Sequence, residues 1–134
     1  MAEKLHLEII TPKTTIVAED VDTFVAPGKD GEFQVMPLHT PFLTALTVGP
    51  LSYTVDGKQK FVSIQGGFCE VQSEKSVILA HTAEDAGNID VSRAQEAKQR
   101  AEDRLESNDP EIDDERAHAA LSRALNRIRV ASLK

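Results

Sequence analysis

The chain has 134 residues, a length typical of one domain or of a small domain with an appendage. Its 40% hydrophobic and 28% charged residues fit a globular protein and exclude a wholly disordered one. The formal net charge of −7 argues against nucleic acid as a partner. A lone cysteine, Cys69, excludes an intramolecular disulfide and is typical of a reducing compartment.

Residues 1–82 alternate between apolar and other side chains with a period of two, as β-strands do. Leu5, Leu7 and Ile9 are the first such series, and turn residues follow every eight to twelve positions. The dipeptide Asp56-Gly57, between the strand-like runs 51–55 and 59–64, predicts a tight hairpin. Many short strands at this spacing predict an antiparallel β-sandwich, or flattened barrel, over residues 1–86.

The composition changes after Thr82, where Ala, Glu, Gln, Lys and Arg begin to dominate. Asn88 or Asp90 can cap the start of a first helix, and Pro110 suits the first turn of a second. Apolar residues recur at three and four positions in each predicted helix: Val91, Ala94, Ala97, Ala101 and Leu105, then Ala117, Leu121, Ala124, Leu125 and Ile128.

Two antiparallel helices are therefore predicted for residues 87–134, which makes the whole chain an α+β protein. Their apolar stripes consist largely of alanine, and alanine buries little area at about 25 cal/mol per Å² of apolar surface. We therefore expect this helical hairpin to be weakly docked and movable.

The same arginine spacing occurs once in each predicted helix, at offsets of zero, seven and eleven residues. These offsets lie on one helical face. Like charges four residues apart cost about 0.2–0.5 kcal/mol per pair, so each stripe calls for carboxylates, phosphates or an acidic partner. The stripes consist of Arg93, Arg100 and Arg104, and of Arg116, Arg123 and Arg127.

Charge is distributed unevenly along the chain. Residues 116–134 hold four Arg, one Lys and no acid, so they carry +5 and leave −12 for residues 1–115. A basic tail of this kind suggests an acidic surface or an anionic ligand. Cations at the C-terminal end of a helix also complement its dipole, which is an alternative for Arg127, Arg129 and Lys134.

Other motifs give weaker signals. His39 with Asp30 or Glu32 could serve a small hydrolase, but the local sequence offers only Thr40 as a nucleophile, so we expect a structural or contact role for His39. The remaining histidines and Cys69 lack metal-ligand spacing, and no metal site is predicted. Gly66-Gly67 lacks the rest of a phosphate loop and predicts a bulge or a close backbone approach.

The first residues include neither a basic run nor a long apolar run, so no secretory signal is predicted. No apolar stretch approaches the length of about 18 residues that spans a bilayer. We expect any membrane association to pass through another protein.

Several runs together resemble the epsilon subunit of bacterial rotary ATP synthases: residues 31–46, 49–51, 66–71, 77–80 with 83–85, and 89–94. The resemblance covers nearly the whole chain, in order. Gln34 and Leu38 depart from it, because glycine is common at both positions, and His81 stands where an acid is frequent.

The resemblance implies a non-catalytic subunit of the rotating central stalk, peripheral on the cytoplasmic face of the cell membrane. The sandwich would bind the gamma subunit and rest on the ring of c subunits. The extended hairpin would meet acidic segments of the catalytic beta subunits and inhibit ATP hydrolysis. The implied c-ring contacts are Gly28, Asp30, Gly31, Glu32 and His39; the implied inhibitory contacts are Arg116, Arg123, Arg127 and Arg129.

Several bacterial members of this family bind ATP as a regulatory ligand, and their Ile/Leu-Asp-x-x-Arg-Ala signature is matched at residues 89–94. The resemblance implies that Glu84, Ile89, Asp90 and Ala94 lie on the adenine side, and that Arg93, Arg100, Arg123 and Arg127 face the phosphates. Two alternatives stay open. The acids Glu84, Asp90, Glu96 and Glu102 could pair with the arginines in solvent, or the chain could be an ATP sensor outside any motor.

Overall fold

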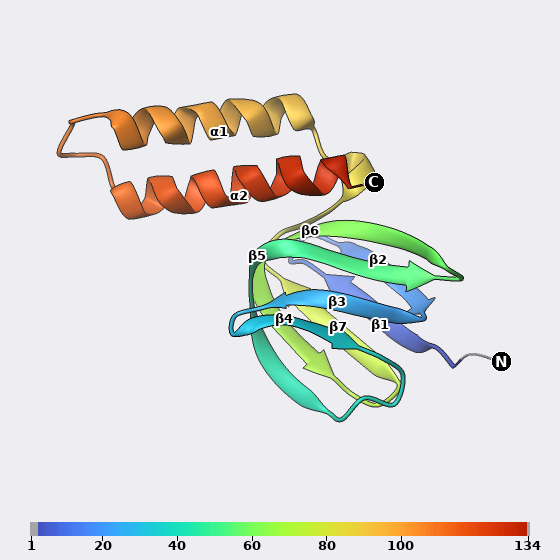
Figure 1. Cartoon of the computed structure of the whole chain (residues 1–134). Coiled ribbons are helices and arrows are strands. Elements are labelled where there is room, and N and C mark those ends of the chain that lie inside the picture. The colour runs from blue at the N-terminus through green and yellow to red at the C-terminus, as the bar shows by residue number, and fades with distance from the viewer. Residues whose placement is uncertain (1–2, 134) are drawn as a thin grey trace.

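The structure, a computed structural model, describes residues 3–133; Met1 and Ala2 of the predicted sandwich and Lys134 of the basic tail lie outside the described residues. An eight-stranded sandwich is followed by a short 3-10 helix and two α-helices (Figure 1). The elements are β1 (Leu5–Ile10), β2 (Thr15–Val21), β3 (Thr23–Gly28), β4 (Gly31–Val35), β5 (Phe42–Val55), β6 (Lys58–Val71), β7 (Lys75–Ala80), β8 (Ala83–Asp85), η1 (Ala86–Asn88), α1 (Val91–Glu106) and α2 (Asp114–Ser132).

The strands form one sheet in the order β2-β1-β7-β6-β5-β3-β4, and β8 adds to β6. The two 14-residue strands β5 and β6 pair along their whole length and curve around one side of the sandwich (Figure 1). The predicted α+β architecture is confirmed. One pairing differs from the antiparallel expectation: β1 and β7 run parallel. Alternation of apolar residues identifies a strand but carries no information about its partner or direction.

The core lies between the two layers of the sandwich. Leu5, Leu7 and Ile9 are buried, as their alternation predicts. Cys69 is also fully buried, and burial raises the pKa of its thiol to about 12, so the group is neutral at physiological pH. Cys69 therefore behaves as a small apolar core residue.

Two glycine-containing sites set the shape of β6. Asp56 and Gly57 join β5 to β6 with φ values of 50° and 81°, the left-handed pair that a two-residue hairpin of type I′ requires. At Gly67 a Cβ atom would lie 2.1 Å from the backbone oxygen of Leu79. The predicted hairpin and the predicted close backbone approach are therefore both present.

The helices begin at aspartate caps. Asp90 accepts a hydrogen bond from the backbone N–H of Arg93 at 3.1 Å, so Asp90 rather than Asn88 caps α1. Asp113 caps α2 in the same way, through Arg116 N at 3.1 Å. The prediction that Pro110 lies in the first turn of the second helix is wrong: Asp109 accepts from Glu111 N and holds a separate turn before α2.

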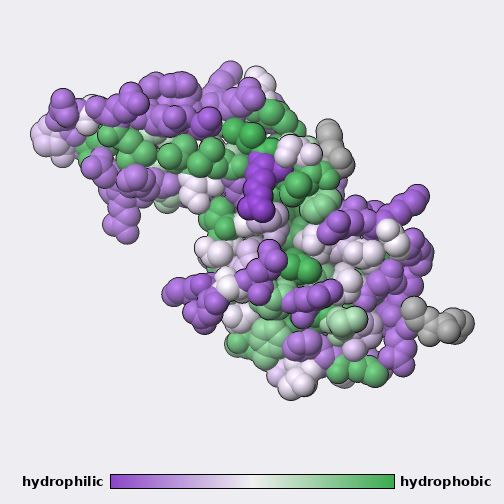
Figure 2. All heavy atoms as spheres, in the orientation of Figure 1, coloured by the Kyte–Doolittle hydropathy of each residue, from purple (hydrophilic) through white to green (hydrophobic). Residues whose placement is uncertain are grey.

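The helices pack on each other through buried alanines, and Figure 2 shows an apolar band between the two helices. Val91 and Leu125 were expected on the buried stripes, but both are exposed. The residue next to Leu125, the polar Asn126, is the buried one. The prediction from the apolar pattern considered only apolar residues and therefore missed Asn126. The alanines buried between the helices are Ala94, Ala101, Ala117 and Ala124.

The hairpin docks on the sandwich through the C-terminal end of α2, which contacts β5, β6 and η1 (Figure 1). Val130 and Ala131 form a small second core with Ala86, Ile89 and Phe61. Within residues 3–133, no helix has the length and apolar character needed to cross a membrane.

Candidate functional site

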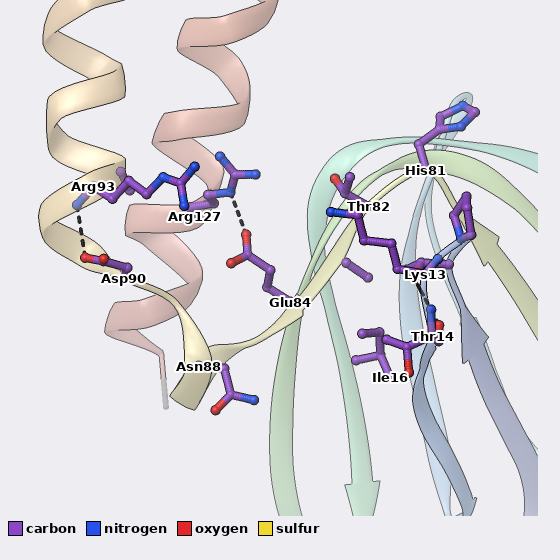
Figure 3. Close-up of a pocket in the computed structure, with 14 residues that line it drawn as sticks. Lys13, Thr14, Ile16, His81, Thr82, Glu84, Asn88, Asp90, Arg93 and Arg127 are labelled. Carbon is purple, nitrogen blue, oxygen red and sulfur yellow. Dashed lines mark hydrogen bonds and ion pairs between the residues drawn. The ribbon is translucent and has the colours of Figure 1, made fainter.

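A pocket of about 580 Å³ lies where the sandwich meets the hairpin. Its walls come from the β1–β2 loop, the β7–β8 connection, the segment that leads into α1, and Arg127 on α2 (Figure 3). The volume is in the range of small-molecule sites. Because both parts of the molecule supply walls, the complete pocket exists only while the hairpin is docked.

Arg127 is the centre of a polar network in this pocket. Its Nε donates to Glu84 Oε1 at 2.6 Å (Figure 3). With the Gln65 amide oxygen facing the guanidinium, Arg127 also donates to Gln65 from Nε at 3.0 Å and Nη2 at 3.1 Å, while Gln65 donates to Thr82 Oγ1 at 2.7 Å. That amide orientation turns the Gln65 oxygen toward the N–H groups of Arg127 and its NH2 group toward Thr82, and the single Nε–H of Arg127 is then shared between Glu84 and Gln65. The network links α2 to β6 and β8.

Arg93 and Lys13 line the same pocket, and the structure gives neither side chain an ion pair with a described residue. In Figure 3 the Arg93 side chain runs from the start of α1 toward Arg127. The Asp90 carboxylate accepts the hydrogen bond from the backbone N–H of Arg93 that caps α1. Two cations without carboxylate partners therefore face a cavity of nucleotide size, which suits an anionic ligand.

The pocket brings together five of the eight residues implied for ATP binding: Glu84, Asp90, Arg93, Ala94 and Arg127. Ile89 instead packs in the second core, with 9% of its surface exposed. Arg100 and Arg123 do not line the pocket. Arg100 lies two turns beyond Arg93, about 10 Å along the axis of α1.

The carboxylate alternative accounts for one arginine of the two stripes. Arg127 pairs with Glu84, whereas Glu102 pairs with Lys98 instead. Among residues 3–133, the other stripe arginines have no ion pair with an acid. Most of the like-charge cost of the stripes is therefore not offset inside the described chain.

Sequence reasoning missed Gln65 and Lys13. Gln65 is a buried position in the middle of β6, and Lys13 belongs to a turn 78 residues before the start of α1. A buried amide in a strand and a lysine in a turn carry no local signal that connects them to Arg127. The pairing of β6 with β8 places Ser63 opposite Glu84 and so brings Gln65 near the network, while the docked hairpin and the β1–β2 loop place Arg127 and Lys13 on one pocket.

The residues implied for c-ring contact lie around β4, an edge strand of the sheet (Figure 1). Gly28, Asp30, Gly31 and Glu32 form or border the β3–β4 turn, while His39 follows the other end of β4. They border one edge rather than forming one cluster.

His39 shows no catalytic arrangement. Its Nδ1 lies 2.7 Å from the backbone oxygen of Thr40, and its ring is 5.3 Å from that of Phe42. Within the described chain it contacts neither Asp30 nor Glu32 through a hydrogen bond or ion pair. No group of three His, Cys, Asp or Glu residues between positions 3 and 133 could hold a metal ion.

An exposed apolar stripe crosses four strands on the outer face of the sandwich. The register places Phe68 opposite both Ala45 and Leu79, and Leu79 opposite Ile10. Phe68 is 54% exposed and Leu79 56%. Leu43 is also exposed; it lies two residues before Ala45 on β5, on the same face of the sheet, and pairs with Glu70. Exposed apolar side chains gathered in this way mark a protein-binding surface.

The arginines implied for the inhibitory contact lie along α2. Arg116 and Arg129 are exposed, whereas Arg123 is partly buried and Arg127 is held by Glu84. Docking of the hairpin therefore occupies at least one of the four.

The fold and the site define a class: a β-sandwich with a docked two-helix hairpin and a pocket at their joint. Two family models match the chain, the beta-sandwich domain of the ATP synthase delta/epsilon chain at residues 4–86 and its long alpha-helix domain at residues 88–132. The chain belongs to the ATP synthase delta/epsilon chain family, and the expected family is confirmed.

Curated relatives agree over nearly their full length. ATP synthase epsilon chains of Nitratidesulfovibrio vulgaris and Desulforamulus reducens are each 50% identical, with 97% of both chains covered in the first case and 98% and 99% in the second. A subunit of the Euglena gracilis mitochondrial ATP synthase structure has the same fold, with a TM-score of 0.81 at 22% identity over 98% of this chain and 82% of that one.

Proposed function

We propose that this protein is a non-catalytic central-stalk subunit of ATP synthase that links the gamma subunit to the c-ring. Family membership and the exposed stripe around Phe68 support the proposal. Burial of apolar surface is the main driving force of stable association. The stripe is the proposed gamma-binding surface, and the β4 edge with its neighbouring loops is the proposed c-ring surface. The complex would hold the chain at the cytoplasmic face of the membrane.

The gamma contact is tested by Phe68→Ser. Phe68 is half exposed, so we expect the variant to keep its fold while its affinity for gamma falls at least tenfold, the effect of about 1.4 kcal/mol of lost apolar burial. Co-purification and calorimetry with isolated gamma provide the measurement. Leu125→Ser, another exposed apolar residue but on the hairpin, is the matched control. Equal binding of both variants would contradict this surface assignment.

The pocket at the joint carries the regulatory part of the proposal. We infer that it binds ATP and that the ligand holds the hairpin down, because the walls of the pocket belong to both parts. A ligand that binds only one of two conformations shifts the population toward it. At low ATP the hairpin would leave the sandwich, turn its basic face to the acidic segments of the beta subunits and inhibit hydrolysis.

The nucleotide site is tested by Arg93→Ala combined with Arg127→Ala. In calorimetry, we expect wild type to show saturable binding specific for ATP over GTP, and the double variant to lose it together with ATP-dependent compaction of the hairpin. Arg104→Ala with Arg116→Ala removes two stripe arginines outside the pocket and is the control pair. ATP affinity unchanged in the pocket variant would rule out the phosphate assignment.

Among the alternatives, a free-standing ATP sensor would share the pocket but fail to bind gamma, so the Phe68 experiment separates the two. The geometry of His39 does not support the hydrolase hypothesis. Its ring nitrogen meets a backbone carbonyl rather than a carboxylate. The cationic pocket remains the observation on which the sensing function rests.

A further inference from the structure

The cations at the pocket come from opposite walls. Arg93 and Arg127 belong to the hairpin, whereas Lys13 belongs to the β1–β2 loop of the sandwich. Figure 3 shows the Lys13 side chain extending from its loop past Thr82 toward the hairpin side of the cavity. A ligand between these walls meets positive charge from both parts of the molecule.

The loop that carries Lys13 is a closed turn. Thr11 Oγ1 accepts from the backbone N–H groups of Lys13 at 3.3 Å and Thr14 at 3.2 Å, and donates to Thr14 O at 3.0 Å. Thr11 N donates to the same carbonyl at 2.8 Å. These bonds hold the backbone of the turn, so they place the base of the Lys13 side chain at the cavity, while its long stem leaves the charged end mobile.

Some charged groups of the pocket have a partner within the chain and others do not. Glu84 forms an ion pair with Arg127, and the Asp90 carboxylate caps α1. Lys13 and Arg93 are left without an acidic partner among the described residues. Lysine binds phosphate as a mobile point charge with three donors, and it suits a ligand whose charge is spread over several oxygens.

We propose that Lys13 is a phosphate-binding residue of this pocket, and that a bound nucleoside triphosphate connects the sandwich to the hairpin through Lys13 on one side and Arg93 and Arg127 on the other. This inference rests on the proposed ATP site. It makes the sandwich a participant in nucleotide sensing rather than a passive support. The ligand then stabilises the docked hairpin by bridging two walls, in addition to filling the cavity.

The test compares ATP binding to Lys13→Gln, Lys13→Arg and wild type by calorimetry. We expect a five- to tenfold weaker affinity for Lys13→Gln and near wild-type affinity for Lys13→Arg, because charge rather than shape is needed. The loss should shrink in high salt, which screens an exposed charge. Lys58→Gln, which removes an exposed lysine at the β5–β6 turn, is the matched control and should bind as wild type does.

The outcomes separate this inference from the proposed function. If wild type binds ATP and Lys13→Gln binds it as tightly as Lys58→Gln, the Lys13 assignment is overturned and the ATP site stands. If Lys13→Arg is as weak as Lys13→Gln, the charge argument is overturned. If wild type fails to bind ATP at millimolar concentration, the ATP site itself is overturned, and the Lys13 inference with it.

Discussion

At the scale of single residues, Leu38 has a strained backbone although its side chain is exposed and gains little from burial. Its φ of 65° lies in the left-handed region, which costs a residue with a Cβ about 1–2 kcal/mol. It is nevertheless 61% exposed, so its side chain adds little to the core. The surrounding turn holds it, with Leu38 N donating to Ser73 O at 2.7 Å. Strain kept at an exposed apolar residue beside His39 suggests a contact role.

Replacement of Leu38 by glycine should raise the free energy of unfolding by about 0.5–1 kcal/mol, because relief of the left-handed strain exceeds the entropy that glycine adds to the unfolded chain. Urea denaturation measures the change. Leu43→Gly, at an exposed leucine in the strand β5, should instead lower stability. A destabilised Leu38→Gly would show that the side chain, and not the backbone, determines this turn.

At the scale of elements, local sequence features predicted most of the secondary structure. Asp90 caps α1, the Asp56-Gly57 turn closes the β5–β6 hairpin, and alternation gives the buried face of β1. The errors fall where a distant segment decides. Ala83 follows the change in composition after Thr82, and pairing with Ile64 keeps it in the sandwich as part of β8, within the predicted bounds of residues 1–86. Leu125 faces solvent because Asn126 occupies the buried position.

At the scale of the whole molecule, Asn126 joins the two parts. Its Nδ2 lies within hydrogen-bonding distance of Gly49 O at 3.1 Å, Ser63 Oγ at 3.0 Å and Ile64 O at 3.3 Å. The apolar contact between hairpin and sandwich around Asn126 involves few residues, mainly Val130, Ala131 and Ala86 of η1. A buried amide that meets three acceptors therefore contributes both stability and a defined docking geometry.

Asn126→Ala should destabilise hairpin docking by about 1–3 kcal/mol, because it leaves two buried carbonyl groups without this donor. Hydrogen exchange of α2 measures the opening, with Asn108→Ala in the exposed interhelical loop as the control. The proposed switch adds a second expectation. Apparent ATP affinity should fall with the docked fraction although Asn126 does not line the pocket. Protection of α2 unchanged from wild type would exclude Asn126 as the docking residue.

The sequence by itself determined the β-sandwich, the two helices, Asp90 as one of two candidate caps of α1, and the family, because period, turn chemistry and ordered motifs are local properties. It also indicated five of the residues that line the pocket, through the family signature and the arginine stripes. Only the tertiary structure decided the parallel β1–β7 pair, the position of Gln65 beside Arg127, the place of Lys13 on the same pocket, and the docking through Asn126. The partners in that docking are up to 77 residues apart, and no local pattern records which distant surfaces meet.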